Sequence, residues 1–295
     1  MRPQRSALGF AVRPGRQTRR REVAIDLDLN GKTALVTGAH RGTGAGIAWA
    51  LAREGAHVVV NGPTEDAAGD TANTIVAAGH QASIAAGDVA THDGANAVVA
   101  RLVEAKRDID ILVANYGTAE RKRWTDADDA AWLDMYEKNV LSAVRLIRAL
   151  TPGMKARGSG RVILIGTIGS TRPAARMPHY YAAKAALPAI TVSLAKELSG
   201  SGITVNLVSP GLIATAEVID MARKRGKRES WTEADDPNPT ALLRRLAASD
   251  MPNPVGRIAT VDEVGDLVAF LAGSRAAFIN GQNIRIDGGA VDVTV

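Results

Sequence analysis

From Lys32 onward, short apolar runs alternate with longer alanine-rich segments, and this alternation constrains the fold more than any other feature of the chain. The short runs are rich in β-branched residues, which predicts strands, and the longer segments carry apolar residues at helical spacing. The predicted strands are 33–37, 57–61, 82–86, 110–114, 161–165, 204–208 and 283–286. The predicted helices are 44–54, 65–78, 93–106, 127–150, 178–198 and 261–271. Because such alternation favours right-handed crossovers, we expect an α/β fold with a doubly wound, mostly parallel seven-stranded sheet and helices on both faces.

The length of the chain suits one large α/β domain, which we place at residues 31–295. Segment 216–254 breaks the alternation and is rich in charged residues, proline and asparagine, so we expect it to be irregular. Residues 1–30 precede the domain as a basic N-terminal extension, which we expect to be disordered.

The high pI of the chain comes from this extension. Residues 1–22 carry seven arginines and one glutamate, a net charge of +6, and subtracting this from the formal charge of +5 leaves −1 for residues 23–295. A domain without a basic balance disfavours nucleic acid as a partner. The apolar run Ala7–Val12 is too short for a secretory signal, and the extension is too poor in serine for a transit peptide.

Membrane insertion, disulfides and metal binding are all disfavoured. No apolar stretch reaches the roughly 18 residues of a membrane-spanning helix. The absence of cysteine is compatible with a reducing compartment, and we expect a cytoplasmic location. The five histidines show no metal-ligand spacing, so no metal site is predicted, and His179 is expected at a solvated helix start.

The segment TGAHRGTG, residues 37–44, follows the first predicted strand and opens the first predicted helix. Glycines in such a loop permit positive φ angles and let the backbone approach a phosphate at a helix N-terminus. The spacing G-x-x-x-G-x-G differs from the more common dinucleotide pattern, but its place between a strand and a helix indicates a dinucleotide site.

Further motifs follow in a characteristic order. They are Asp88–Val89, the A-N-Y-G of residues 114–117, Asn139, the Y-x-x-x-K from Tyr180 to Lys184, and Pro210–Gly211. Together with the glycine loop they resemble the short-chain dehydrogenase/reductase family in its compact single-domain form, over about residues 32–289. The resemblance implies a Rossmann-like fold, an oxidoreductase activity, a substrate lid at about 216–254, and a homotetramer or homodimer. Within that lid, Trp231 and Met251 would either cover the substrate or anchor the loop.

The resemblance also implies a set of cofactor-binding residues. They are Gly38, Arg41, Gly42, Thr43, Gly44, Asn61, Thr64, Asp88, Val89, Asn115, Gly117, Pro210, Gly211, Ile213 and Thr215, together with Tyr180 and Lys184. Relatives that prefer NAD place an acid where this chain has Gly62, and Arg41 resembles the base that receives the 2′-phosphate of NADP. An arginine often found shortly after the second strand is replaced by Pro63. We therefore expect NADP(H) to be preferred, with NAD(H) possible.

The catalytic residues follow from the same resemblance. Helical spacing lets either Tyr180 or Tyr181 share a face with Lys184, and the family pattern selects Tyr180. A cationic lysine and an oxidised nicotinamide nearby would both favour the phenolate, so we expect them to move the phenol pKa toward the range that suits acid and base catalysis. Thr167 stands where the family usually has the serine that orients the substrate, and Asn139 matches its relay asparagine. Enoyl reductases of the same fold use a longer spacing, which would fall on Met177 and is disfavoured.

These features predict an enzyme that transfers a hydride between NADP(H) or NAD(H) and a small alcohol or carbonyl substrate. The alternative is a catalytically vestigial protein that binds and senses NAD(P). The substrate itself is not predicted by the sequence.

Overall fold

The computed structural model describes residues 25–291 and contains one seven-stranded sheet in which every pairing is parallel. The strands are β1 (Thr33–Val36), β2 (His57–Val60), β3 (Ala82–Ile84), β4 (Ile111–Ala114), β5 (Gly160–Ile165), β6 (Ile203–Pro210) and β7 (Asn283–Ile286). Their order is β3-β2-β1-β4-β5-β6-β7, which confirms the predicted doubly wound, Rossmann-like fold.

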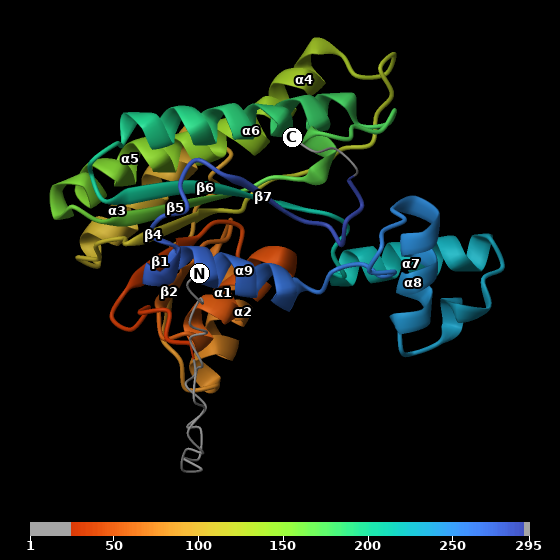
Figure 1. Cartoon of the computed structure of the whole chain (residues 1–295), viewed down its shortest axis with the longest axis horizontal. Helices are drawn as coiled ribbons and strands as arrows, with labels where there is room; N and C mark the ends of the chain where they lie inside the picture. The colour runs from red at the N-terminus through yellow and green to blue at the C-terminus, as the bar shows by residue number, and fades with distance from the viewer. Residues whose placement is uncertain (1–24, 292–295) are drawn as a thin grey trace, which may run out of the picture.

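Helices cover both faces of the sheet (Figure 1). On one face lie α1 (Gly42–Arg53), α2 (Glu65–Ala77) and α9 (Val261–Ala272), and on the other lie α3 (His92–Glu104), α5 (Ser142–Arg157) and α6 (Pro178–Glu197). Because both faces are covered, central strands such as β4 and β6 are buried at every residue. That burial explains why the strands are continuous apolar runs rather than alternating ones.

The sheet order reverses between β1 and β4, since the chain winds outward from β1 in one direction and from β4 in the other. At such a switch point the loops that follow neighbouring strands diverge and leave a crevice at the carboxyl ends of the strands. The glycine loop follows β1 and the A-N-Y-G segment follows β4, so the fold brings these two motifs to the same crevice.

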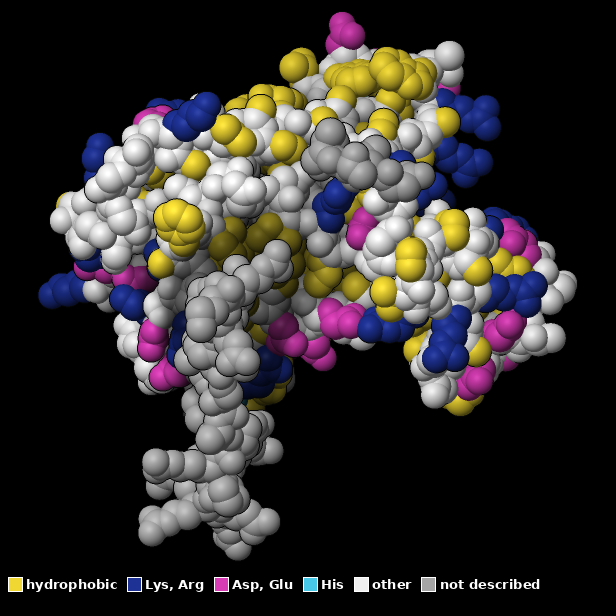
Figure 2. All heavy atoms as spheres, in the orientation of Figure 1, with side chains coloured by type: hydrophobic (Ala, Val, Ile, Leu, Met, Phe, Trp, Pro, Cys, Tyr) yellow, Lys and Arg dark blue, Asp and Glu magenta, His cyan; other side chains and the backbone are white. Residues whose placement is uncertain are grey.

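The prediction that segment 216–254 is irregular is wrong. It contains α7 (Ala216–Arg228), a 3-10 turn at Thr232–Asp235 and α8 (Thr240–Asp250). Arginine, lysine and glutamate are good helix formers, so a charged segment need not be a loop. Figures 1 and 2 show this lid as a lobe that stands out from the body, with charged side chains over its surface.

The lid has a small core of its own, formed by Ala222, Trp231, Leu242 and Leu246. The guanidinium groups of Arg225 and Arg245 each lie 5.0 Å from the centre of the Trp231 ring. Trp231 therefore anchors the lid internally and is not a cover over the substrate.

Two further boundaries differ from the prediction. The helix expected at 127–150 is divided into α4 (Asp129–Tyr136), a π-helical turn at Glu137–Leu141, and α5. Residues 25–30, expected to belong to a disordered extension, are packed: Leu29 is 1% exposed and the Leu27 carbonyl accepts a hydrogen bond from the Ser274 amide. Residues 1–24, which include the arginine-rich part, lie outside the described residues.

Candidate active site

The residues predicted for the site lie on the segments that follow β1 to β6 and on α6, at the carboxyl edge of the sheet. The glycine loop needs its glycines for conformation and for space. Gly38 and Gly42 have φ angles of +61° and +55°, and a Cβ on Gly44 would overlap the Gly38 carbonyl. Helix α1 begins at Gly42 without a side-chain cap, because the extended residue Arg41 makes no capping hydrogen bond. The amides of its first turn are therefore free to bind an anion. Thr43 lies in this first turn and is half-buried.

Two asparagines hold the loops around this helix start. The amide of Asn61 donates to the carbonyls of Ala85 and Gly87, at 2.9 and 3.0 Å, and its oxygen accepts from the Gly38 amide. The Asn115 amide donates to the Thr37 carbonyl at 2.9 Å. Both side chains bond to the backbone, so they position the glycine loop.

Gly62, at the end of β2, has no room for an acidic side chain. A Cβ on Gly62 would lie 3.2 Å from Ala68 and 3.2 Å from the Cβ of His40. The ring of His40 therefore occupies the neighbourhood in which the family's NAD-preferring members carry an acid. Burial lowers the pKa of His40, so the neutral ring is favoured there.

The segment after β3 offers one exposed and one buried residue. Asp88 is exposed, and its carboxylate accepts a hydrogen bond from the Ala90 amide at 3.0 Å. Val89 is 1% exposed and packs in the core. Thr64 caps α2 by accepting from the Ala67 amide, so its hydroxyl oxygen serves that helix start.

The segment after β6 crosses over the glycine loop. Pro210 ends the strand, the Gly211 amide donates to the Ile286 carbonyl at 3.0 Å, and Ile213 pairs with Ala259. Thr215 caps α7, and a Cβ on Gly42 would lie 3.6 Å from its methyl carbon. The lid therefore begins directly against the start of α1.

Lys184 is a buried amine at the centre of the crevice. It is 4% exposed, its Nζ donates to the Ile165 carbonyl at 2.9 Å, and burial lowers its pKa to about 8. A Cβ on Gly117 would lie 2.9 Å from this Nζ and 2.6 Å from Oδ1 of Asn139. The backbone of Gly117 therefore fills the space between the lysine and the asparagine.

Asn139 lies in the π-helical turn and is 2% exposed. Its amide donates to the carbonyls of Thr118 and Met135, at 2.9 and 3.0 Å, and its oxygen accepts from the Thr118 amide at 3.2 Å. Single π-helical turns within α-helices are frequently found at functional sites. Here the wide turn carries the side chain that fixes the loop after β4 beside Lys184.

The phenol of Tyr180 is buried, and this burial raises its pKa to about 12. The neighbouring Tyr181 raises it further, while a hydrogen bond with the Thr167 side chain acts in the opposite direction. The expectation of a lowered phenol pKa is therefore wrong for the protein alone. Removal of the phenol from water outweighs the neighbouring groups, and no effect of Lys184 on Tyr180 is resolved.

Thr167 and Tyr181 differ in their surroundings. The Thr167 oxygen accepts a hydrogen bond from the Gly169 amide at 3.1 Å, and the Thr167 side chain is close enough to Tyr180 to lower the pKa of its phenol. Tyr181 covers the backbone of Gly169 so closely that a Cβ there would overlap its ring. The Tyr181 ring also lines an apolar cavity of about 380 Å³ with Trp124 and Trp132. Tyr180, not Tyr181, thus shares its surroundings with Thr167.

His179 corrects another expectation, since it is 1% exposed and not solvated. Its ring packs against Trp132 with centroids 6.1 Å apart, because α4 lies against this end of α6. Neither ring nitrogen has a hydrogen-bond partner within residues 25–291, and the Glu120 carboxylate lies 3.7 Å from Nε2.

Three residues of the crevice were not predicted from the sequence. The Thr37 hydroxyl accepts from the Tyr116 amide at 2.9 Å, Glu217 of the lid pairs with Arg41 at 3.6 Å, and Arg121 contacts Met221 of the lid. Thr37 directly precedes the glycine loop and could have been found from that position. The other two depend on where the lid packs, for which the sequence carries no local signal.

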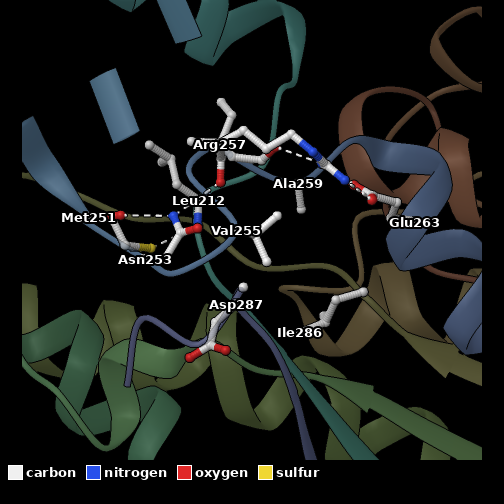
Figure 3. A pocket seen from close by; sticks show the side chains of 11 residues that line it. Leu212, Met251, Asn253, Val255, Arg257, Ala259, Glu263, Ile286 and Asp287 are labelled. Carbon is white, nitrogen blue, oxygen red and sulfur yellow. Dashed lines mark hydrogen bonds and ion pairs between the residues drawn. The ribbon is translucent and has the colours of Figure 1, made fainter. Parts of the chain in front are cut away.

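A cavity of about 200 Å³ lies beside the crevice at the base of the lid (Figure 3). Arg257 pairs with Glu263 of α9 at one end of it, and the amide of Asn253 donates to the carbonyls of Met251 and Arg257. The sulfur of Met251 accepts from the Leu212 amide at 3.2 Å. These bonds attach the segment between α8 and α9, which leads from the lid back to the body, and Met251 is one of the attached residues.

Residues 25–291 include no helix that combines the length and the apolar character of a membrane span. They also contain no group of three or more histidine or acidic side chains placed to hold a metal ion.

Comparisons with known proteins extend over nearly the whole described chain. A sequence model of the family described as enoyl-(acyl carrier protein) reductase matches residues 38–291. The 3-oxoacyl-(acyl-carrier-protein) reductase FabG of Vibrio cholerae is 33% identical over 263 residues, which cover 89% of this chain and 98% of that protein.

Solved structures are similar over the same range. The L-sorbose reductase of Gluconobacter frateurii, complexed with NADPH and L-sorbose, has a TM-score of 0.84 and 34% identity, covering 91% of this chain and 100% of its own. A gluconate 5-dehydrogenase from Burkholderia cenocepacia, in complex with NADP and tartrate, has a TM-score of 0.77 and 29% identity, covering 91% and 98%.

Proposed function

The chain belongs to the short-chain dehydrogenase/reductase family of oxidoreductases, and from this premise we propose that it interconverts an alcohol and a carbonyl compound with NADP(H). Tyr180 acts as the general acid in reduction and as the general base in oxidation. The observation that carries the proposal is that Tyr180 and Lys184 lie one turn apart on α6, with the Lys184 amine buried and the Thr167 side chain close enough to lower the pKa of the Tyr180 phenol.

The properties of the protein alone fit the reducing direction. A phenol with a pKa of about 12 holds its proton at neutral pH and can donate it to a carbonyl oxygen. The Thr167 side chain favours the phenolate that remains, and we assign Lys184, which is protonated below its pKa of about 8 and lies one turn along α6, as its electrostatic partner during the reaction. Asn139 keeps the loop after β4 in place beside that amine.

The glycine loop fits a nicotinamide dinucleotide. The uncapped start of α1 and the glycines at positive φ offer backbone amides to its phosphates. When bound, the cofactor supplies or accepts the hydride. Arg41 and the absence of an acid at Gly62 support a preference for NADP(H), and the two similar solved structures contain NADPH or NADP.

A screen tests the proposal. Carbonyl compounds and alcohols would be offered with NADPH, NADH and their oxidised forms, and turnover followed by nicotinamide absorbance. The expected result is turnover that is lost in Tyr180→Phe. Tight binding of NADP(H) without turnover of any compound would instead support the catalytically vestigial, cofactor-sensing protein.

Two further properties stay predictions. We expect a homotetramer or homodimer, which light scattering of the purified protein would measure. The cytoplasmic location is likewise untested, and fractionation of cells that express the full chain would measure it.

A further inference from the structure

Arg121 is an exposed residue on the loop that follows β4, four residues after Gly117. The next residue fixes this loop to the start of α6, because the Met177 amide donates to the Lys122 carbonyl at 2.9 Å. Met177 is held at a φ angle of +67°, which is uncommon for a residue with a side chain. The backbone of Arg121 is thus tied to the turn that leads into Tyr180.

The side chain of Arg121 reaches from this loop to the lid. Its Nη2 donates to the sulfur of Met221 in α7 at 3.3 Å. Its charge also reaches Tyr181 of α6 and Asp250 at the end of α8, where it adds to the hydrogen bonds from Ser249 and Arg225 that lower the pKa of the Asp250 carboxyl. The guanidinium therefore stands between the three elements that surround the entrance.

Arg121 differs from two arginines of the lid, Arg225 and Arg245. Arg225 pairs with Glu229 at 2.9 Å and Arg245 pairs with Glu233 at 3.0 Å. Within residues 25–291 no carboxylate lies within 4.0 Å of the Arg121 guanidinium, and its recorded partner is a thioether, which is a weak acceptor. Most of its donors remain for a partner that enters the crevice.

We propose that Arg121 binds a carboxylate of the substrate, so that the preferred substrates are carbonyl compounds and alcohols that also carry a carboxylate. This inference rests on the proposed oxidoreductase function and names its substrate class. A planar guanidinium pairs with a carboxylate through two parallel hydrogen bonds. A single negative charge fits better than the double charge of a phosphate ester, because the carboxylates of Asp250 and Glu120 lie nearby and would repel the double charge more strongly.

The test compares matched pairs of carbonyl probes that differ in one carboxylate. The first pair is 5-keto-D-gluconate and L-sorbose, since the former is L-sorbose with the hydroxymethyl group farthest from the ketone oxidised to a carboxylate. The second is 4-carboxybenzaldehyde and its methyl ester. In whichever pair the wild-type protein reduces with NADPH, kcat/KM should be higher for the member with the carboxylate than for the neutral member. Arg121→Gln should lower that value about 10- to 100-fold, chiefly through KM, and leave the neutral member unchanged.

Arg123→Gln, two residues along the same loop, is the matched control, because it removes an exposed arginine without touching the lid contact. It should leave both members unchanged, and Arg121→Lys should restore part of the activity on the acid. Equal losses for acid and neutral probes in Arg121→Gln would show that Arg121 only holds the lid. A wild-type preference for the neutral probes would also overturn the inference while leaving the oxidoreductase function intact. Reduction of no probe and no other carbonyl would contradict the proposed function itself, and this inference with it.

Discussion

Arg41 of the glycine loop lies 3.6 Å from Glu217 in the first turn of α7, so an ion pair joins the predicted 2′-phosphate site to the lid. Both side chains are more than half exposed, at 71% and 54%. Exposed pairs of this kind contribute little, about 0–1 kcal/mol. A phosphate that binds Arg41 can therefore displace Glu217 at small cost, and binding of NADP(H) would then release this contact of the lid.

The first prediction concerns that pair. Arg41→Ala should raise the KM for NADPH about tenfold or more and change the KM for NADH little. Only NADPH carries the 2′-phosphate that the guanidinium is expected to bind. Glu217→Gln removes a competing anion and should lower the KM for NADPH a few-fold. Steady-state kinetics with both cofactors would measure these effects. Equal losses for both cofactors in Arg41→Ala would contradict the assignment.

The second prediction separates the two tyrosines. Tyr180→Phe keeps the ring and removes the transferable proton, so turnover should fall by about 10²- to 10⁴-fold. Tyr181→Phe should change turnover little, since the Tyr181 ring packs on Gly169 and lines an apolar cavity. The relevant measurement is kcat for each variant with a substrate from the screen. If Tyr181→Phe lost turnover and Tyr180→Phe kept it, Tyr181 and not Tyr180 would be the acid and base of the reaction.

The sheet could be predicted from the sequence because its strands are buried on both faces. Runs such as His57–Val60 are short, β-branched and continuous. The helices of the lid could not be predicted because they bury little: α7 buries only Ala222 and Gly226. The folding of the lid depends on Trp231 and on contacts with α8 that are distant in the sequence.

The candidate site divides in the same way. The glycine loop and the spacing from Tyr180 to Lys184 are local patterns, so the sequence predicts them. The position of Arg121 and the pairing of Glu217 depend on how the lid packs. For the protein alone, the phenol pKa is raised and not lowered, because the burial of Tyr180 has no counterpart in the sequence pattern.

The third prediction uses the space around Gly117. Gly117→Ala should lower kcat strongly, by about 10-fold or more, because the added methyl group would lie 2.6 Å from Asn139 Oδ1 and 2.9 Å from Lys184 Nζ. Gly69→Ala in α2 is a matched control, since its added Cβ would meet nothing nearer than 3.9 Å. Turnover and melting temperature would be measured for both variants. Unchanged turnover in Gly117→Ala would show that Lys184 Nζ can move away from its present position without loss of activity.

The fourth prediction follows the titration of Lys184. Burial lowers its pKa to about 8 from 10.5, so between these values the unfolded chain binds more protons at this residue than the folded chain. Its contribution to the free energy of unfolding therefore rises with pH across that window. Lys184→Met lacks this titration, so its stability relative to the wild type should be greatest below about pH 8. That relative stability should then fall by about 3 kcal/mol as pH approaches 10.5.

Urea denaturation of the wild type and Lys184→Met at several pH values between 7 and 10 would measure this difference. The titration of Tyr180 is common to both proteins and cancels. Parallel stability profiles would mean that the amine titrates in the folded protein as it does in water.

The last prediction concerns Thr167, whose hydroxyl has two partners. Its oxygen accepts from the Gly169 amide and its hydrogen bond with Tyr180 favours the phenolate. Thr167→Ser retains both bonds and should keep most of the activity. Thr167→Val has nearly the same shape without the hydroxyl, so turnover should fall about 10-fold or more while cofactor binding survives.

Because the lost bond to Gly169 also caps a 3-10 turn, melting temperature and NADPH affinity must be measured beside kcat. A valine variant that is destabilised but turns over normally would make Thr167 a structural residue. Ser170, whose hydroxyl donates to the Thr167 carbonyl at 2.8 Å, would then be the nearest alternative for orienting the substrate.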